Sequence, residues 1–591
     1  MSDISLRQLA DSLLVNKTAG NIVQRVGFHW PPPPVVSIRE VVRCTQQTPW
    51  TNAPQTQSMT PQLTCNATCV EDIVAAVQIA ERNGGHVHAV GSAWSFSDCA
   101  MGLNPANMCL VETSGLNNPI QTVQKALLGG LDSALFYHVQ AGITIHDLYT
   151  NLDNFVDPVA NQPRPLGLLT MGGASGQTLA GAFSTGTHGG DYLMPPLADS
   201  ILAIHLVGAG GVQYWIEPTH GITDPNRLQM LVVPNISPQN IIYDDATFNA
   251  CLVSFGCMGV IYAVVVKVRD QYNLVETSTL TTWQAFVSTL PAPLTDQSAR
   301  FLQLAVDPYT KSDGTNTCLV TTRTEGGAPA CTCAQGDVNG AIISLLEDMI
   351  TSDPIDALKV GVQGVIDLIN GGGAFNTMNT TLVTLVNAIL SQAMGLRSVL
   401  TNDYGNVMTA VWPPGTCGGK SYCVMDTGQR GSATNKPPTP PPAPSFSIEM
   451  FFPSTGQTPT GFPWVDFVNS IVTAVNAATD TFLTGYVGIR FMGQTRAMLG
   501  MQQSGQTCSI EISTLGGVQG ELALLTSILD MALQAGANVH WGQLIDLDIQ
   551  GNGNRYPQFQ AWRQVYARLS NNFTTRTFEN ALSTRWQLTT P

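Results

Sequence analysis

The segment that decides the fold is GGASGQTLAGAFSTGTHGG, from Gly172 to Gly190. Seven of its 19 residues are glycine and most of the others are small or hydroxylated, so the backbone can approach a flat or anionic ligand and offer it N–H groups. A turn between strands needs only about two to five residues, so the segment is too long to be a simple turn. It matches neither G-x-G-x-x-G nor G-x-x-x-x-G-K-[ST], the usual signatures of nicotinamide and P-loop nucleotide sites.

A second loop of small residues, Ala89–Asp98 (AVGSAWSFSD), follows the expected strand HVHAV directly. Two such loops could wrap the pyrophosphate of a dinucleotide. Before the strand, VEDIVAAVQIAERNG has apolar residues at helical spacing and ends at Gly84-Gly85, which predicts a helix. Apolar runs at residues 198–211 and 253–270 predict buried strands, so the first half is expected to be an α+β unit that ends near Asp270.

Composition and charge narrow the class of function. The chain has 591 residues, 44% hydrophobic and 11% charged, and its net charge of −15 opposes binding to nucleic acid. No apolar run is long enough to predict a transmembrane helix. The start MSDISLRQLADSLL lacks the features of a secretory signal, which favours a cytoplasmic location, although the low lysine content and four Asn-x-Thr sequons weigh mildly against it.

Thirteen cysteines, an odd number, leave at least one thiol unless two molecules pair. None of the close cysteine pairs has a second cysteine or histidine pair at zinc-site spacing, so we expect no metal site. Local disulfides or buried thiols are the favoured interpretation.

The second half changes character several times. Residues 271–330 alternate in polarity, which predicts antiparallel strands, and residues 339–402 predict three helices with almost no charge. These helices are either an insertion packed on the second domain or a face that rests on a membrane or a bulky apolar substrate. A Pro-rich linker at 430–445 precedes further strand-like segments and a helix at Leu522–Ala535.

Three segments resemble the FAD-contacting segments of the vanillyl-alcohol oxidase flavoprotein superfamily, and most of all its sugar-lactone and alditol oxidase branch. They are VHAVGSAWSFSD, MGGASGQTLAGAFSTGTHGGD and TFNACLVSFGCMGVIYAVVVKV. The resemblance implies an α+β fold with a two-subdomain PCMH-type FAD-binding domain and a cap/substrate domain that has an antiparallel sheet and a helical insertion. The implied FAD contacts are Val90, Gly91, Ser92, Ala93, Trp94, Ser95, Gly173, Ser175, Gly176, Thr178, Gly181, Ser184, Thr185, Gly186, Thr187, His188, Gly189, Gly259, Val260 and Ile261.

The domain organisation follows from the same resemblance. We expect an N-terminal arm at 1–40, the FAD-binding domain at 41–270, the cap domain at 271–535, and a segment at 536–591 that returns to the FAD-binding domain. In the cap, SYCVMDTGQRG followed by SIEMFFP resembles the family's Ser-Tyr segment and its E-x-x-x-P strand, here Glu449 to Pro453. GIRFMG is similar to the E-x-R-F strand, and HWGQ at His540 resembles HWGK.

Three departures from the family pattern bear on function. Many members carry flavin covalently on a histidine of the first loop, but Trp94 stands there and cannot form that bond, so we expect noncovalent FAD, with His188 as a conceivable substitute for the link. Gly488 replaces the glutamate of E-x-R, and Gln543 replaces the lysine of HWGK. With two polar groups fewer, the pocket is expected to accept a larger or more apolar alcohol.

The candidate catalytic residues are Arg490, His540 and Glu449. Arg490 is expected to orient the substrate or balance the flavin anion, unless it points to the surface. His540 could be the proton acceptor or a hydrogen-bonded core residue. Glu449 lies between apolar residues, where a buried carboxylate needs a partner such as Arg490 or a substrate hydroxyl, and Glu511 in SIEIST is its equal rival.

The function expected from these residues is FAD-dependent oxidation of a C–OH group in a small alcohol, polyol or lactone. Hydride passes to flavin N5, with O2 the expected acceptor of the electrons. A dehydrogenase with another acceptor, or a non-catalytic protein that keeps the fold, is the alternative.

Overall fold

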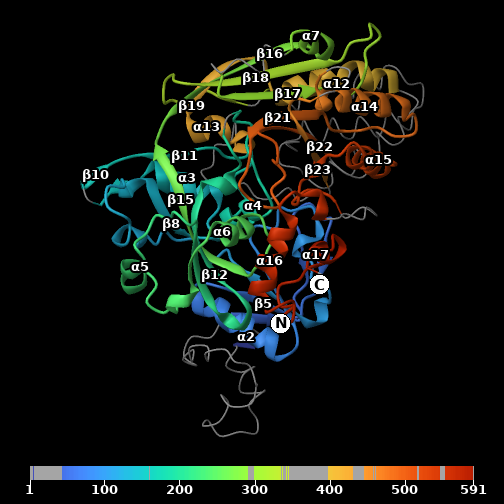
Figure 1. Cartoon of the computed structure of the whole chain (residues 1–591). Coiled ribbons are helices and arrows are strands. Elements are labelled where there is room, and N and C mark those ends of the chain that lie inside the picture. Colours follow the sequence, from blue (N-terminus) through green and yellow to red (C-terminus); the bar gives the residue numbers. More distant parts are fainter. Residues whose placement is uncertain are drawn as a thin grey trace, which may run out of the picture.

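The computed structural model describes residues 43–290, 299–336, 397–429, 445–514, 518–545 and 553–589, apart from a few single positions, and the short strand β1 (Ile4–Ser5). Two halves face each other: the first 270 residues with the closing helices below, and an eight-stranded sheet above (Figure 1). The three helices predicted from residue 339 onward lie almost wholly outside the described residues, as do most of the N-terminal arm and the Pro-rich segment 430–444.

The first small sheet contains parallel pairs next to helix α2 (Val70–Arg82). Its strands, in spatial order, are β1, β2 (Arg43–Gln46), β5 (Leu63–Asn66), β7 (Met108–Glu112) and β6 (His86–Val90). Ile73 and Val77 of α2 are completely buried against these strands, as the helical spacing predicts. The helix ends before Gly84, whose φ of +66° is a conformation that glycine adopts without strain.

A second sheet, of six strands, carries the Gly-rich segment on its edge. The strands are β11 (Leu166–Leu168), β15 (Val260–Asp270), β12 (Ile201–Val207), β13 (Gln213–Glu217) and β14 (Ile241–Tyr243), with β8 (Phe136–Gln140) paired to β15. Helix α4 (Leu179–Ser184) forms within the Gly-rich segment. The remaining helices of this half are α3 (Ile145–Asp153), α5 (Pro225–Leu231) and α6 (Asp245–Leu252).

The prediction of a strand at residues 253–270 is only partly correct. The strand begins at Val260, because Phe255, Gly256 and Gly259 take positive φ values of 38°, 81° and 143° and form a turn. At Gly259 a β-carbon would lie 2.5 Å from the carbonyl oxygen of Val207, so only glycine fits this approach. The first residues of the apolar run therefore follow the end of α6 and form a turn, and only the residues from Val260 onward form β15.

The upper half is an eight-stranded antiparallel sheet, as the alternating pattern predicts. Its order is β19 (Gly415–Lys420), β16 (Asn273–Thr282), β18 (Thr317–Glu325), β17 (Phe301–Val306), β21 (Val487–Gly493), β22 (Gln506–Thr514), β20 (Phe446–Pro453) and β23 (Asn538–Val539). Helices α7 (Trp283–Ser288) and α13 (Ser421–Met425) contact β16, and Met408 of helix α12 (Arg397–Val411) packs against Ala305 of β17 and Leu319 of β18.

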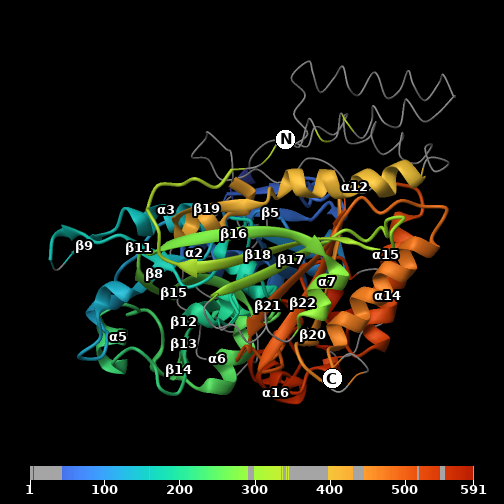
Figure 2. The same cartoon turned by 90° about the horizontal axis from the view of Figure 1, so that it is seen from above.

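The two faces of this sheet differ in polarity. Helices α14 (Pro463–Ala477) and α15 (Glu521–Gln534) cover one face beside β20, β22 and β21 (Figure 2). Phe491 of β21 packs there against Trp464 of α14, with ring centroids 5.2 Å apart. Because side chains alternate along a strand, Gly488 and Arg490 point to the opposite face, toward the lower half. The sheet therefore has an apolar side under helices and a polar side above the Gly-rich loops.

The C-terminal helices α16 (Phe559–Leu569) and α17 (Ala581–Arg585) return to the lower half (Figure 1). The indole N–H of Trp562 donates to the carbonyl of Ala250 at 3.1 Å, and Arg585 pairs with Asp98 at 2.6 Å. These contacts join the end of the chain to α6 and to the loop that follows β6. The loop geometry around Asp98 therefore depends on residues almost 500 positions away.

Six of the thirteen cysteines form three disulfides: Cys44–Cys65, Cys331–Cys423 and Cys333–Cys417. Six of the remaining seven thiols are buried, so both predicted fates of the cysteines occur. Among the described residues, no helix is long and apolar enough to cross a membrane.

Candidate active site

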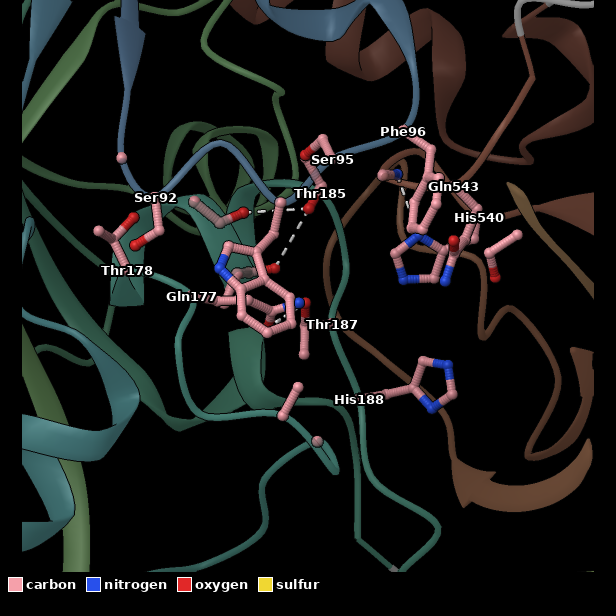
Figure 3. A pocket seen from close by; sticks show the side chains of 18 of the residues that line it. Ser92, Ser95, Phe96, Gln177, Thr178, Thr185, Thr187, His188, His540 and Gln543 are labelled. Atoms are coloured by element: carbon pink, nitrogen blue, oxygen red, sulfur yellow. Dashed lines mark hydrogen bonds between the residues drawn. The ribbon is translucent and has the colours of Figure 1, made fainter. Parts of the chain in front are cut away.

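A cavity of about 470 Å³ lies between the Gly-rich loops of the lower half and the polar face of the eight-stranded sheet. This volume is within the usual range of small-molecule sites. The loop after β6 and the segment Gly172–Gly190 form one wall, and strands β17, β18, β20, β21 and β22 form the other. Ser92 and Thr178 lie on one side of the close-up, and His188, His540 and Gln543 lie on the other (Figure 3).

Most of the predicted cofactor residues line this cavity. The lining residues among them are Val90, Gly91, Ser92, Ala93, Trp94, Ser95, Gly173, Thr178, Gly181, Ser184, Thr185, Thr187, His188, Gly189, Gly259 and Ile261. Ser175, Gly176, Gly186 and Val260 do not line it. Gly186 instead turns with a φ of +91° against the Met501 side chain, and Val260 is the first residue of β15.

The loop after β6 and the Gly-rich segment touch each other. A β-carbon on Gly91 would lie 1.9 Å from Thr178 Oγ1, so this contact admits no side chain at residue 91. Ala93 takes a φ of +57°, which turns the chain sharply before Trp94. The indole nitrogen of Trp94 is buried and has no hydrogen-bond partner among the described residues. A buried donor beside exposed loop N–H groups fits a large ligand rich in acceptors, such as FAD.

Three buried ionisable side chains meet across the cavity, although they come from distant parts of the chain. His188 Nδ1 lies 2.7 Å from the carbonyl oxygen of Gly189, and His188 Nε2 lies 3.0 Å from Glu449 Oε1. Burial alone raises the pKa of Glu449, but the charge and hydrogen bond of His188, with help from Arg490 and His540, hold that pKa well below its usual range. Glu449 is therefore a stable anion.

His540 lies beside this pair in a defined tautomer. Its Nδ1 accepts the backbone N–H of Gly542 at 3.0 Å, and its Nε2 lies 3.9 Å from Glu449 Oε2. Burial lowers the pKa of His540 to about 4, so the ring is neutral at pH 7. Because Nδ1 accepts, the single ring proton is on Nε2, and His540 presents a donor to its surroundings.

Arg490 and Glu511 form a second polar group on the same wall. Arg490 contacts the Glu511 carboxylate directly and lies 4.0 Å from Glu449 Oε1, so it does not point to the surface. Glu511 Oε1 accepts hydrogen bonds from Ser447 Oγ at 3.3 Å, Ser513 Oγ at 3.2 Å and Gln543 Nε2 at 3.2 Å.

The sequence interpretation missed several wall residues. Ser447, Ser513, Tyr486, Gln303, Arg323 and Trp412 all line the cavity. Ser447 precedes Glu449 by two residues and Ser513 follows Glu511 by two, so the period of a strand could have identified both. Gln303 and Arg323 could not be identified in this way, because β17 and β18 contain no residue that the family pattern had singled out. The wall is more polar than the two missing family groups suggest.

Comparisons with known proteins agree with this geometry. Residues 61–217 match a family model described as an FAD binding domain. An L-gulono-1,4-lactone dehydrogenase of Mycobacterium tuberculosis is 28% identical over 162 residues, 27% of this chain and 33% of that protein. The L-gulonolactone oxidase of Mus musculus is 24% identical over 243 residues, 41% of this chain and 45% of its own. A D-arabinono-1,4-lactone oxidase of Yarrowia lipolytica is 25% identical over 227 residues, 38% of this chain and 36% of its own.

Among solved structures, cholesterol oxidase from Brevibacterium sterolicum aligns with 94% of this chain and 99% of its own, at a TM-score of 0.62 and 12% identity. Residues 61–217 therefore match an FAD-binding domain and the chain has the fold of this cholesterol oxidase, so the predicted resemblance and the α+β fold class are confirmed. Its curated relatives are sugar-lactone oxidases and dehydrogenases, of whose length the matched region spans about a third to under a half.

Proposed function

We propose that the chain is an FAD-dependent oxidoreductase that converts a C–OH group of a small molecule to C=O. The observation that carries the proposal is the single cavity that joins the Gly-rich cradle to a wall with Arg490, Glu511, Glu449 and two histidines. Such a wall meets the needs of alcohol oxidation: groups that fix the hydroxyl, an acceptor for its proton, and positive charge near the oxidant.

Bound FAD supplies the acceptor for the hydride that leaves the carbinol carbon. The chain supplies the rest. The loops at Gly91 and Gly173 offer N–H groups and close approach, and Trp94 offers an indole N–H that has no partner in the described part of the chain. Arg490 brings a fixed positive charge to the cavity, and the Nε2–H of His540 is a neutral donor.

The flavin is held noncovalently, because Trp94 occupies the position where many family members carry a histidine. His188 is not free to replace it, since both ring nitrogens face oxygen atoms of Gly189 and Glu449. Acid precipitation of the purified protein should leave the yellow colour in the supernatant. A yellow pellet would contradict noncovalent binding.

The substrate carries several hydroxyl groups, as a sugar lactone or polyol does. Support comes from the row of hydroxyl, amide and charged side chains on the cavity wall, namely Ser445, Ser447, Ser513, Gln303, Gln543, Arg323 and Glu511. This disfavours the apolar alcohol suggested by the missing glutamate and lysine. Apolar alcohols that reduce the flavin faster than polyols and lactones would restore that alternative.

The decisive test is anaerobic mixing of the FAD-loaded protein with a panel of lactones, polyols and apolar alcohols, followed by flavin absorbance. Bleaching by one class supports the enzyme and identifies the substrate class. A flavin that no compound bleaches supports the non-catalytic alternative. We take O2 as the acceptor, which predicts that air restores the absorbance and yields one H2O2 per turnover; a dehydrogenase would need an added dye.

The three disulfides favour an oxidising compartment over the cytoplasm predicted from the N-terminus, because cytosolic thiols are kept reduced. If the purified protein is unfolded without a reducing agent and its thiols are titrated, seven free thiols should be found. Thirteen would support the cytoplasmic prediction.

A further inference from the structure

The proposed oxidation needs a group that takes the proton of the reacting hydroxyl as hydride leaves. Four ionisable side chains of the described cavity wall could do so: His540, His188, Glu449 and Glu511. The hydrogen bonds already made by each of them decide which one has a free acceptor site facing the cavity.

His540 has none. Its Nδ1 already accepts the Gly542 N–H, and its Nε2 carries the ring proton, so neither nitrogen can receive another without the loss of a backbone hydrogen bond. His188 is also occupied. Its Nδ1 lies 2.7 Å from the carbonyl oxygen of Gly189, and its Nε2 lies 3.0 Å from Glu449 Oε1.

Glu449 is a poor acceptor for a different reason. Its side chain is only 2% exposed, Oε1 lies 3.0 Å from His188 Nε2, and Oε2 lies 3.9 Å from His540 Nε2. Both of its oxygens thus already face a histidine ring nitrogen. Glu449 therefore positions the two histidines.

Glu511 is the acceptor that remains. Its side chain is 21% exposed, lines the cavity, and receives three hydrogen bonds from neutral groups on one oxygen and Arg490 on the other. A carboxylate oxygen has about two lone-pair sites, so a substrate hydroxyl can also donate to it. A weak base is sufficient, because the hydroxyl becomes strongly acidic as hydride departs.

The register of the sheet explains why this carboxylate comes from β22. Gly488 of β21 lies directly opposite Glu511, and Glu511 lies directly opposite Glu449 of β20. Residues directly opposite in an antiparallel sheet project from the same face, so the three positions form a row above the cavity. Gly488 has no side chain, which leaves the space beside Arg490 to Glu511. The carboxylate missing from the E-x-R strand is thus present one strand away.

We propose that Glu511 is the catalytic base, in place of a carboxylate at residue 488. In this step, which rests on the proposed function, the carbinol C–H bond breaks and its electron pair leaves with the hydrogen as hydride to FAD. The O–H bond breaks, its electron pair forms the second C–O bond, and the proton goes to Glu511. The products are the C=O compound, reduced FAD and a neutral Glu511, which returns its proton to water.

The test compares wild type, Glu511→Gln and Glu511→Asp in single-turnover anaerobic flavin reduction with the best substrate of the panel. Removal of a general base should slow reduction by about 10²- to 10⁴-fold in Glu511→Gln, with Glu511→Asp between it and wild type. Binding of the product, measured from the flavin spectrum, should change less than threefold. Asp466→Asn, on α14 at the opposite face of the sheet, is the charge-loss control.

A second pair of variants tests whether a carboxylate at residue 488 can replace the one at residue 511. A β-carbon on Gly488 would meet only ordinary contacts, the nearest at 3.6 Å, so a side chain fits there once residue 511 is small. Gly488→Glu combined with Glu511→Gly should reduce flavin at least tenfold faster than Glu511→Gly alone.

The outcomes separate the two proposals. If wild type reduces its flavin and Glu511→Gln matches it within threefold, with FAD and product bound normally, Glu511 is not the base although the enzyme is an alcohol oxidoreductase. If Glu511→Gln loses product binding as well as rate, Glu511 has a binding role and the base is elsewhere. If no C–OH compound bleaches the wild-type flavin, the proposed function fails and the base fails with it.

Discussion

Two buried carboxyl groups in the upper half make the stability of the eight-stranded sheet depend on pH. Asp307 follows β17 directly and is completely buried; Oδ1 accepts the Tyr309 N–H at 2.9 Å, and Oδ2 has no partner among the described residues. Burial raises the pKa of Asp307 to about 7. Glu521, at the start of α15, is equally buried, and burial raises its pKa to about 7 as well.

Proton linkage determines whether the free energy of unfolding rises or falls with pH. In the unfolded chain an aspartate has a pKa of about 3.9, so between about pH 4 and pH 7 the folded protein holds a proton that the unfolded chain has lost. Stability contributed by that proton is fully present below pH 4 and is lost as the pH rises through 7. The loss is about 1.36 kcal/mol per pH unit for each group, or about 4 kcal/mol over the window.

Asp307→Asn removes one of these titrations and keeps the acceptor for the Tyr309 N–H. The free energy of unfolding of the variant, minus that of wild type, should rise by about 4 kcal/mol between pH 4 and pH 8. The assay is urea denaturation of the FAD-saturated protein at half-unit pH steps, read by tryptophan fluorescence. Glu521→Gln should give a similar change, and the two should add.

Asp313→Asn is the matched control. Asp313 lies on the surface six residues further along, and hydrogen bonds from Thr315 lower its pKa, so it is ionised throughout the window above pH 5. Its removal should leave the slope between pH 5 and pH 8 unchanged. If Asp307→Asn and wild type also run parallel over that interval, Asp307 is ionised in the folded protein and the burial argument is refuted.

Three further changes test other parts of the structure. Gly91→Ala should abolish FAD retention on a desalting column, because its β-carbon has no room, whereas Gly129→Ala, in open space, should retain a full complement. Replacing Cys331 and Cys423 by serine should lower the free energy of unfolding by about 2–5 kcal/mol in urea, and an equal midpoint for both proteins would exclude this bond. Arg490→Ala should slow anaerobic flavin reduction more than tenfold while FAD content stays constant; loss of FAD instead would assign Arg490 to cofactor binding.

Local patterns were sufficient to predict the elements that build the walls of the cavity. Glycine density identified the segment at Gly172, and strand-like composition identified the segments that form β20, β21 and β22. The prediction failed at residues 253–259, where an apolar composition that is typical of a strand forms a helix end and a turn. Only tertiary contact, the approach of Gly259 to Val207, decides that point.

The partners within the site could not be predicted, because they depend on register. His188 and Glu449 are 261 residues apart and meet only after the two halves close on each other. Likewise, the sequence offers Glu449 and Glu511 as equal rivals, and a shift of one residue between β20 and β22 would place them on opposite faces. The observed register makes them neighbours with different roles: one is enclosed by histidines and the other is open to the cavity.

The register also shows that two departures from the family pattern belong together. Gly488 stands where the resemblance implies a glutamate, and Gln543 stands where it implies a lysine, so one negative and one positive charge are absent together. Both remaining carboxylates have a partner, since Glu511 contacts Arg490 and Glu449 lies 3.0 Å from His188 Nε2. Gln543 donates to the same Glu511 carboxylate that occupies the space beside Gly488. Loss of only one of the two charges would leave the other as an unpaired ion on the cavity wall, which costs more than the loss of both.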